Sequence, residues 1–148
     1  MRCLQRSLGS LLRTLLAVCG VLVLVLGAAS ADSVTTLGMG MGARNAQSFA
    51  EFEAVIRKYN ASGERFRIDG HCQSACTMFL AIRNVCVTRN ANLLFHAGGN
   101  QDFTDRMLAK YKPSLRKYVT DNQFMATRQF HSIPGSVIIS RFGYRACN

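Results

Sequence analysis

The sequence predicts a small α/β domain, and two observations lead to this fold class. From Asn45 to Gly63, apolar residues recur at spacings of three and four, which is typical of one face of a helix. Short strand-like segments precede and follow this helix and a second apolar run, with no internal repeat. The resulting order of strand, helix, strand, helix, strand favours a small α/β unit with parallel pairing.

The first helix has the best-marked ends. Asn45 opens it, and Gly63 lies just past its end. Its apolar face is formed by Phe49, Phe52, Val55, Ile56 and Tyr59. Before it, residues 32–37 are expected to form a strand that leads into a glycine-rich loop at residues 38–42.

The centre of the chain supplies the remaining elements of the unit. Arg65 to Ile68 alternates in polarity and predicts a strand that runs into Gly70. The apolar run from Ala75 to Ile82 predicts a second helix. Two further strands are expected at residues 85–87 and 92–96.

The last third of the chain is predicted to be helical. A helix over residues 101–112 is broken by Pro113, and Pro134-Gly135 ends the helical region. Between them an amphipathic stripe is formed by Leu115, Tyr118, Val119, Met125 and Phe130. Residues 137–139 fit either a short strand or a final turn packed on the core.

Residues 1–31 have the order of a signal peptide. Three arginines precede an apolar segment at residues 15–27, and the small residues Ala29-Ser30-Ala31 follow it. We expect cleavage before Asp32 and a periplasmic or secreted product. Removing 31 of the 148 residues leaves 117, enough for a single domain over residues 32–148. If the signal segment is not cleaved, it becomes an N-terminal membrane anchor.

The expected mature chain is basic, with 15 Lys and Arg against 8 Asp and Glu. A basic protein of this kind can bind anionic surfaces such as lipid headgroups or acidic polymers. The alternative is that the basic residues only form a solvated surface without a partner. The basic residues are scattered, without a basic run or an interleaved aromatic platform. We therefore expect no nucleic-acid partner.

Four cysteines remain after residue 31, at positions 72, 76, 86 and 147. An even number in an exported chain predicts disulfides, and three pairings are open. We expect at least one bridge among Cys72, Cys76 and Cys86. The alternative is a zinc site with His71, but Cys-x3-Cys has no matching second pair, so no metal is expected. No cofactor is expected either, because the glycine loop lacks the Lys-Ser/Thr ending of a phosphate-binding loop.

The candidate chemistry lies in Gly70-His71-Cys72-Gln73-Ser74-Ala75-Cys76 and in Phe95-His96. A serine on a tight strand-to-helix turn projects its hydroxyl outward, and N–H groups of the first helical turn are free to receive an oxyanion. His96 ends a strand 22 residues later and is a candidate general base for Ser74.

These motifs resemble the proteolytic subunit of the Clp protease, of the crotonase-like superfamily, over residues 33 to 100. The similarity is greater to exported bacterial relatives with a Cys-x-Ser-Ala-Cys turn and a Phe-His strand end. The resemblance implies a small Clp protease/crotonase-like βαβ core with Ser74 as nucleophile and His96 as general base. It also implies oxyanion donors at Ala75 N–H and in the glycine loop, Gly40 among them, acting on a peptide or other acyl substrate.

These residues are compatible with two functions of different classes. One is an exported, peptidase-like serine hydrolase; the other is a catalytically silent exported domain that keeps the fold for binding or assembly. The family's acid lies well after its histidine, whereas this chain has only Asp102, Asp105 and Asp121 there. Without an orienting carboxylate a Ser–His pair loses orders of magnitude in rate.

Simpler roles are open for the same residues. Ser74 can be a helix N-cap, and His96 a half-buried histidine bonded to a backbone carbonyl. A serine–lysine mechanism would need a lysine to fold back over Ser74. The candidates for that role are Lys110, Lys112 and Lys117.

Overall fold

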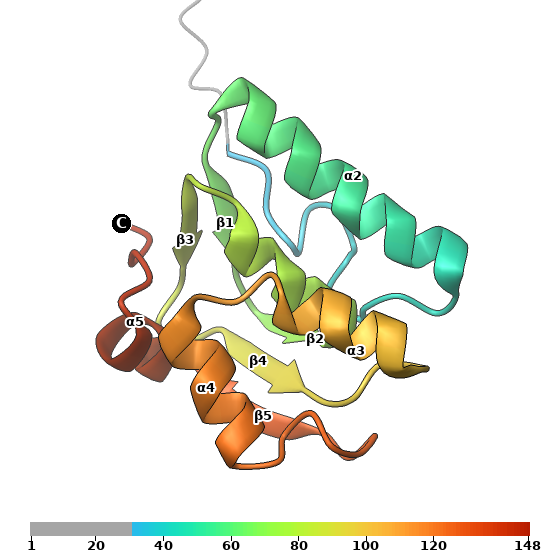
Figure 1. Ribbon diagram of the computed structural model, residues 1–148. Coiled ribbons are helices and arrows are strands. Elements are labelled where there is room, and N and C mark those ends of the chain that lie inside the picture. The colour runs from blue at the N-terminus through green and yellow to red at the C-terminus, as the bar shows by residue number, and fades with distance from the viewer. Residues whose placement is uncertain (1–30) are drawn as a thin grey trace, which may run out of the picture. The chain divides into compact units, whose positions relative to one another are not determined.

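Helices and short strands alternate from Ala46 to Phe142 in the computed structural model, which confirms the α/β class (Figure 1). The structure describes residues 31–148, so the expected signal peptide lies outside the described residues, apart from Ala31. Within the described part, no helix has the length and apolarity that crossing a membrane requires. The elements are α2 (Ala46–Ser62), β1 (Phe66–Ile68), β2 (His71–Gln73), the 3-10 helix η1 (Ser74–Ala81), β3 (Val85–Val87), β4 (Asn92–Phe95), α3 (Gln101–Leu108), α4 (Pro113–Asp121), β5 (His131–Pro134) and α5 (Gly135–Phe142).

The strands of the described region form two small sheets. In one, β1 pairs in parallel with β3; in the other, β4 lies between β2, which is parallel to it, and β5, which is antiparallel. The predicted strand before Gly70 is β1, but the segment after Gly70 is a second strand, which the sequence analysis missed. Gly70 has a φ of 56°, a left-handed conformation that suits glycine and turns the chain from one sheet to the other.

Helix α2 forms as its end signals predict. The Asn45 side chain accepts the Ser48 N–H at 2.8 Å, and Ser48 Oγ accepts the Asn45 N–H at 3.0 Å, which makes a capping box. Gly63 ends the helix in the left-handed conformation, at a φ of 73°. The buried face consists of Phe49, Phe52, Ile56 and Tyr59.

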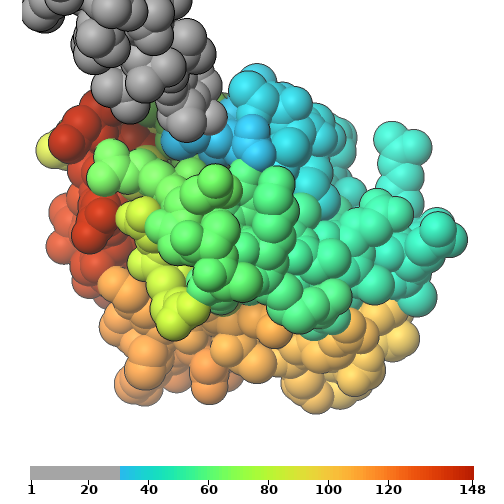
Figure 2. All heavy atoms as spheres, turned by 90° about the horizontal axis from the view of Figure 1, so that it is seen from above, coloured from blue at the N-terminus to red at the C-terminus, as the bar shows by residue number. Residues whose placement is uncertain are grey.

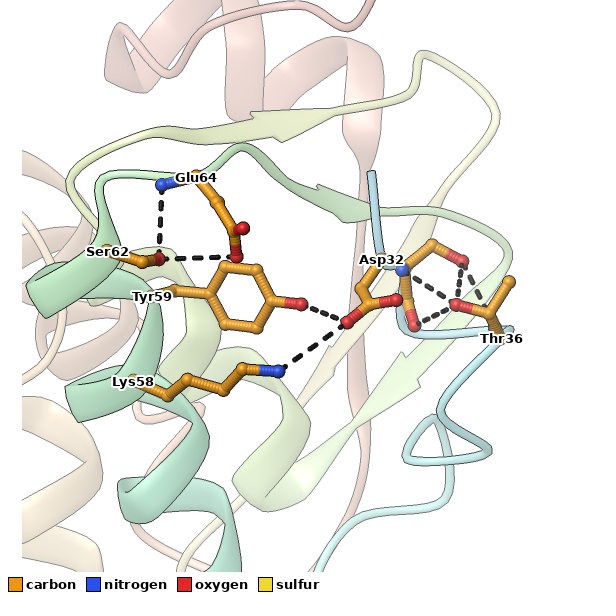
Figure 3. A network of polar contacts seen from close by, with 7 residues as sticks. Asp32, Thr36, Lys58, Tyr59, Ser62 and Glu64 are labelled. Atoms are coloured by element: carbon orange, nitrogen blue, oxygen red, sulfur yellow. Dashed lines mark hydrogen bonds and ion pairs between the residues drawn. The ribbon is translucent and has the colours of Figure 1, made fainter. Parts of the chain in front are cut away.

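The expected first strand at residues 32–37 is wrong. Only Ser33 forms a bridge, to Arg67, and turns follow. The Thr36 hydroxyl accepts the Ser33 N–H at 2.8 Å, so local side-chain bonds compete with strand pairing. Figure 3 shows the same segment held against α2, where the Tyr59 hydroxyl donates to Asp32 and Lys58 Nζ lies 3.9 Å from that carboxylate.

The last third is only partly as predicted. Helices α3 and α4 flank the predicted break at Pro113, but α4 ends at Asp121 because Gln123 takes a left-handed φ of 57°. The expected helical stripe therefore does not reach Phe130. The chain instead returns as β5, which pairs with β4, and residues 137–139 lie in helix α5 rather than in a strand or turn.

Helix η1 is the centre of the core. It packs against α2 on one side and β4 on the other, and every residue from Ala75 to Leu80 is buried (Figure 1). The predicted second helix thus forms one residue earlier, as a 3-10 helix. The burial of Ala75 to Leu80 fixes the position of the residue before them, Ser74.

Cys86 and Cys147 form a disulfide, with Cα atoms 4.9 Å apart. Backbone hydrogen bonds lie on both sides of it, from Val87 N–H to the Arg145 carbonyl at 2.9 Å and from Cys147 N–H to the Val87 carbonyl at 3.0 Å. The bridge thereby attaches the C-terminal segment to β3.

Candidate functional site

Ser74 lies at a turn between a strand and a helix, as the sequence predicts, but the strand is β2 and not the one predicted at residues 65–68. It has a φ of 56°, a left-handed conformation that is uncommon for a residue with a side chain. The N-cap of η1 is Gln73, and no side chain caps that helix end. Among residues 31–148, no hydrogen bond involves Ser74 Oγ, so the N-cap role does not hold and the hydroxyl is unengaged.

A disulfide closes around this serine. Cys72 and Cys76 are bonded to each other, with Cα atoms 5.3 Å apart, which confirms the expected bridge among Cys72, Cys76 and Cys86. The bond joins β2 to η1 and spans Ser74. It also removes both thiolates from the zinc alternative, and the described residues contain no cluster of His, Cys, Asp and Glu suited to a metal.

The glycine loop packs directly on the serine turn. The Gly40 carbonyl accepts the Gln73 N–H at 2.9 Å, and the Met41 carbonyl accepts Gln73 Nε2 at 2.9 Å. At Gly42 the backbone is so close that an added Cβ would lie 2.7 Å from Ser74 Cβ and 3.4 Å from Ala75 N. Glycine is therefore required here for close approach as well as for its φ of 75°.

In the described part of the chain, one backbone amide of the serine turn and one of the glycine loop make no hydrogen bond, although Ala75 itself is fully buried. Within residues 31–148, neither the Ala75 N–H nor the Gly40 N–H donates a hydrogen bond, whereas the Gly42 N–H donates to the Met39 carbonyl at 3.3 Å. The first N–H groups of a helix lack intrahelical partners, which accounts for Ala75. These are the two donor positions that the resemblance implies.

His96 follows β4 as Ser74 follows β2. The register pairs Gln73 with Leu94, so Ser74 is level with Phe95 and His96 comes one residue further on, both at the carboxyl ends of two neighbouring parallel strands. Both imidazole nitrogens are buried, and within residues 31–148 neither makes a well-formed hydrogen bond, although the Ala97 backbone interacts with the ring.

The surroundings of His96 favour a neutral imidazole. The ring of Phe130 stands edge-on to it, with centroids 4.5 Å apart. Burial lowers the pKa of His96, the Ala97 backbone opposes this in part, and the positive charge of Arg128 lowers it further. A neutral ring with a free nitrogen is able to accept a proton.

The serine and histidine are not hydrogen-bonded to each other, because neither imidazole nitrogen has a partner. No carboxylate orients the ring either. The three later acids bond elsewhere: Asp102 to Arg106 at 3.4 Å, Asp105 to Gln101 at 2.8 Å, and Asp121 to Lys117 at 2.7 Å.

The three lysines considered for a serine–lysine mechanism have other contacts. Lys117 Nζ lies 2.7 Å from Asp121, and Lys112 Nζ donates to the Gly143 carbonyl at 2.6 Å. Lys110 Nζ lies 3.8 Å from Glu53. None of these ammonium groups is bonded to Ser74.

Sequence reasoning missed two contributors to the site. The Thr77 hydroxyl donates to the Ser74 carbonyl at 2.7 Å and lies 2.6 Å from the Tyr111 hydroxyl, a buried pair that supports the turn from below. Phe130, expected in a helical stripe, covers His96 and stays 46% exposed. A local pattern carries no signal for either, since their partners lie 34 residues away.

Comparisons of this chain with protein-family models, with curated proteins and with solved structures find no match.

Proposed function

We propose that this protein is an exported, peptidase-like serine hydrolase with a Clp protease/crotonase-like fold, in which Ser74 is the nucleophile and His96 the general base. The observation that carries the proposal is their placement just after two adjacent parallel strands, where ligand sites of open α/β sheets gather. The left-handed backbone at Ser74 adds to it, because such strain clusters at functional sites.

The residues suit acyl transfer to a serine. His96, neutral and with a free nitrogen, takes the proton from Ser74 Oγ as that oxygen attacks the carbonyl carbon of a peptide or other acyl substrate. The carbonyl oxygen becomes an oxyanion, which the N–H groups of Ala75 and Gly40 receive. His96 then returns the proton to the leaving group, and water attacks the acyl-enzyme with His96 again as base.

Substrate binding is required to bring the two side chains together. In unliganded enzymes, catalytic hydrogen bonds are often long and tighten only in the substrate complex. Ser74 Oγ is free to change rotamer, and movement of Phe130, a partly exposed side chain, frees the His96 ring.

Export is part of the proposal. Disulfides form and persist mostly in oxidising compartments, so the two bridges support a periplasmic or secreted location. The signal-like order of residues 1–31 supports the same location.

The second candidate function is a catalytically silent binding domain of the same fold. One observation favours it: no acid bonds to His96, so nothing fixes the tautomer or the orientation of the ring.

A fluorophosphonate probe separates the two candidates. We expect it to label the wild-type protein, Ser74→Ala to abolish labelling, and His96→Ala to slow it by about 100-fold or more. Ser114→Ala, an exposed serine in α4, is the matched control and should label as wild type does. A folded wild-type sample that is not labelled would establish the silent domain.

A further inference from the structure

A cavity of about 540 Å³ lies away from the serine turn, at the opposite end of η1. Three segments form it: residues 80–85, from the end of η1 to the start of β3, residues 110–112 between α3 and α4, and residues 143–145 after α5. In Figure 2 these parts of the chain, yellow-green, orange and red, adjoin on one side of the molecule. The cavity has the size of a site for a small ligand.

The charge of its lining is of one sign. Arg83, Lys110, Lys112 and Arg145 line the cavity, and no acidic residue does. Within the described chain, only Lys110 has a carboxylate within ion-pair distance, Glu53 at 3.8 Å, and Glu53 also pairs with Arg106 at 2.5 Å. Three of the four cations are therefore not neutralised by the protein.

These cations bond to uncharged groups of the protein, and each keeps further N–H donors that are not used. Arg83 donates to the Asn60 carbonyl, Arg145 Nη1 to Asn84 Oδ1 at 3.1 Å, and Lys112 Nζ to the Gly143 carbonyl at 2.6 Å. A guanidinium has five N–H donors and an ammonium three, so each group keeps most of its capacity.

Stabilisation of helix C-termini explains part of this arrangement. Lys112 bonds a carbonyl at the end of α5, and Arg83 one in the last turn of α2. That role does not explain Arg145, which bonds a side-chain amide, nor why four cations border one cavity without an acid.

We propose that this cavity binds a phosphate group, carried either by a small phosphorylated molecule or by a phospholipid headgroup. Two arginines from different segments suit phosphate oxygens, since the guanidinium fork bonds them in pairs. The site is separate from Ser74, so it stands or fails independently of the hydrolase proposal.

The test is a titration of residues 32–148 with inorganic phosphate and with glycerol 3-phosphate. Amide chemical shifts and calorimetry measure the binding. We expect shifts confined to residues 80–85, 110–112 and 143–145. Arg83→Gln with Arg145→Gln should weaken binding at least about tenfold. Arg57→Gln removes an exposed arginine of α2 and is the matched control, expected to bind as wild type does.

Vesicles distinguish the two sources of the phosphate. A phospholipid headgroup is the ligand if the protein binds phosphatidylglycerol vesicles but not phosphatidylcholine vesicles and binds free phosphate only weakly. The double variant should then lose binding to the phosphatidylglycerol vesicles. If the double variant fails to fold by circular dichroism, the single variant Arg145→Gln takes its place. Absence of binding in every arm, or an equal loss in Arg57→Gln, would overturn the proposal.

Discussion

Gly42 lies so close to Ser74 that a Cβ at position 42 would be 2.7 Å from the serine Cβ and 2.7 Å from the Gln73 carbonyl oxygen. Real Cβ atoms do not approach backbone or side-chain atoms so closely. The glycine loop therefore acts as a support for the serine turn.

Gly42→Ala should destabilise the protein and reduce fluorophosphonate labelling of Ser74, because the turn must shift. The left-handed φ costs about 1–2 kcal/mol for alanine, and overpacking adds about 1–3 kcal/mol. Urea unfolding and labelling rates measure both effects. Gly38→Ala is the matched control, since Gly38 also has a positive φ, 64°, but open space around it. Equal losses in the two variants would contradict the packing argument.

Phe130→Ala should raise the pKa of His96 towards its ordinary value of 6.5. Burial lowers that pKa, and the phenyl ring, at 4.5 Å between centroids, is part of what buries the imidazole. Titration of the His96 ring carbon and proton shifts gives the value directly. Leu37→Ala, a second exposed apolar residue, should leave the pKa in place. An unchanged pKa in Phe130→Ala would show that other groups bury the ring.

The stability of the protein should fall in mildly acidic solution because of His96. Since folding lowers the pKa of this group, the unfolded chain takes up a proton first as pH drops through about 6.5, and that uptake favours unfolding. The contribution of neutral His96 to the free energy of unfolding is fully present above pH 6.5 and is lost as the pH falls through the lower pKa of the folded state. Urea unfolding of wild type and His96→Gln from pH 5 to 8 should show a shallower slope in the variant. Identical slopes would rule His96 out as the source.

The two disulfides should have separable effects. Cys86→Ala with Cys147→Ala opens a bridge across 61 residues and should cost about 4 kcal/mol of unfolding free energy, with labelling of Ser74 retained. Cys72→Ala with Cys76→Ala opens a bridge across 4 residues, costs about 2 kcal/mol, and should slow labelling because the turn loosens. Labelling that falls in the first double variant and not in the second would contradict this division.

Local signals were sufficient for the elements that need no distant partner. Helix α2 follows from its apolar spacing and its two caps, and β3 and β4 from short apolar segments. The break at Pro113 is equally local, because proline cannot continue a helix. The same reasoning placed His96 at the end of a strand, where the structure has it, but it did not find β2, the strand that leads into Ser74.

Elements that depend on a partner were missed or misassigned. Strand β2 has only three residues and exists because β4 lies beside it, and β5 replaces a predicted helix because it completes that sheet. Residues 32–37 look like a strand, yet side-chain bonds from Ser33 and Thr36 turn them.

The state of the candidate site was likewise decided by contacts between distant segments. Four cysteines allow three pairings, and only the folded chain brings Cys86 to Cys147, 61 residues on. Phe130, which directly precedes β5, stands edge-on to His96 because β5 pairs with β4. Spacing along the chain determines helices, caps and strand ends, since these form from neighbouring residues. Pairing, burial and pKa depend on which remote side chains fill the space, and that is known only once the core has closed.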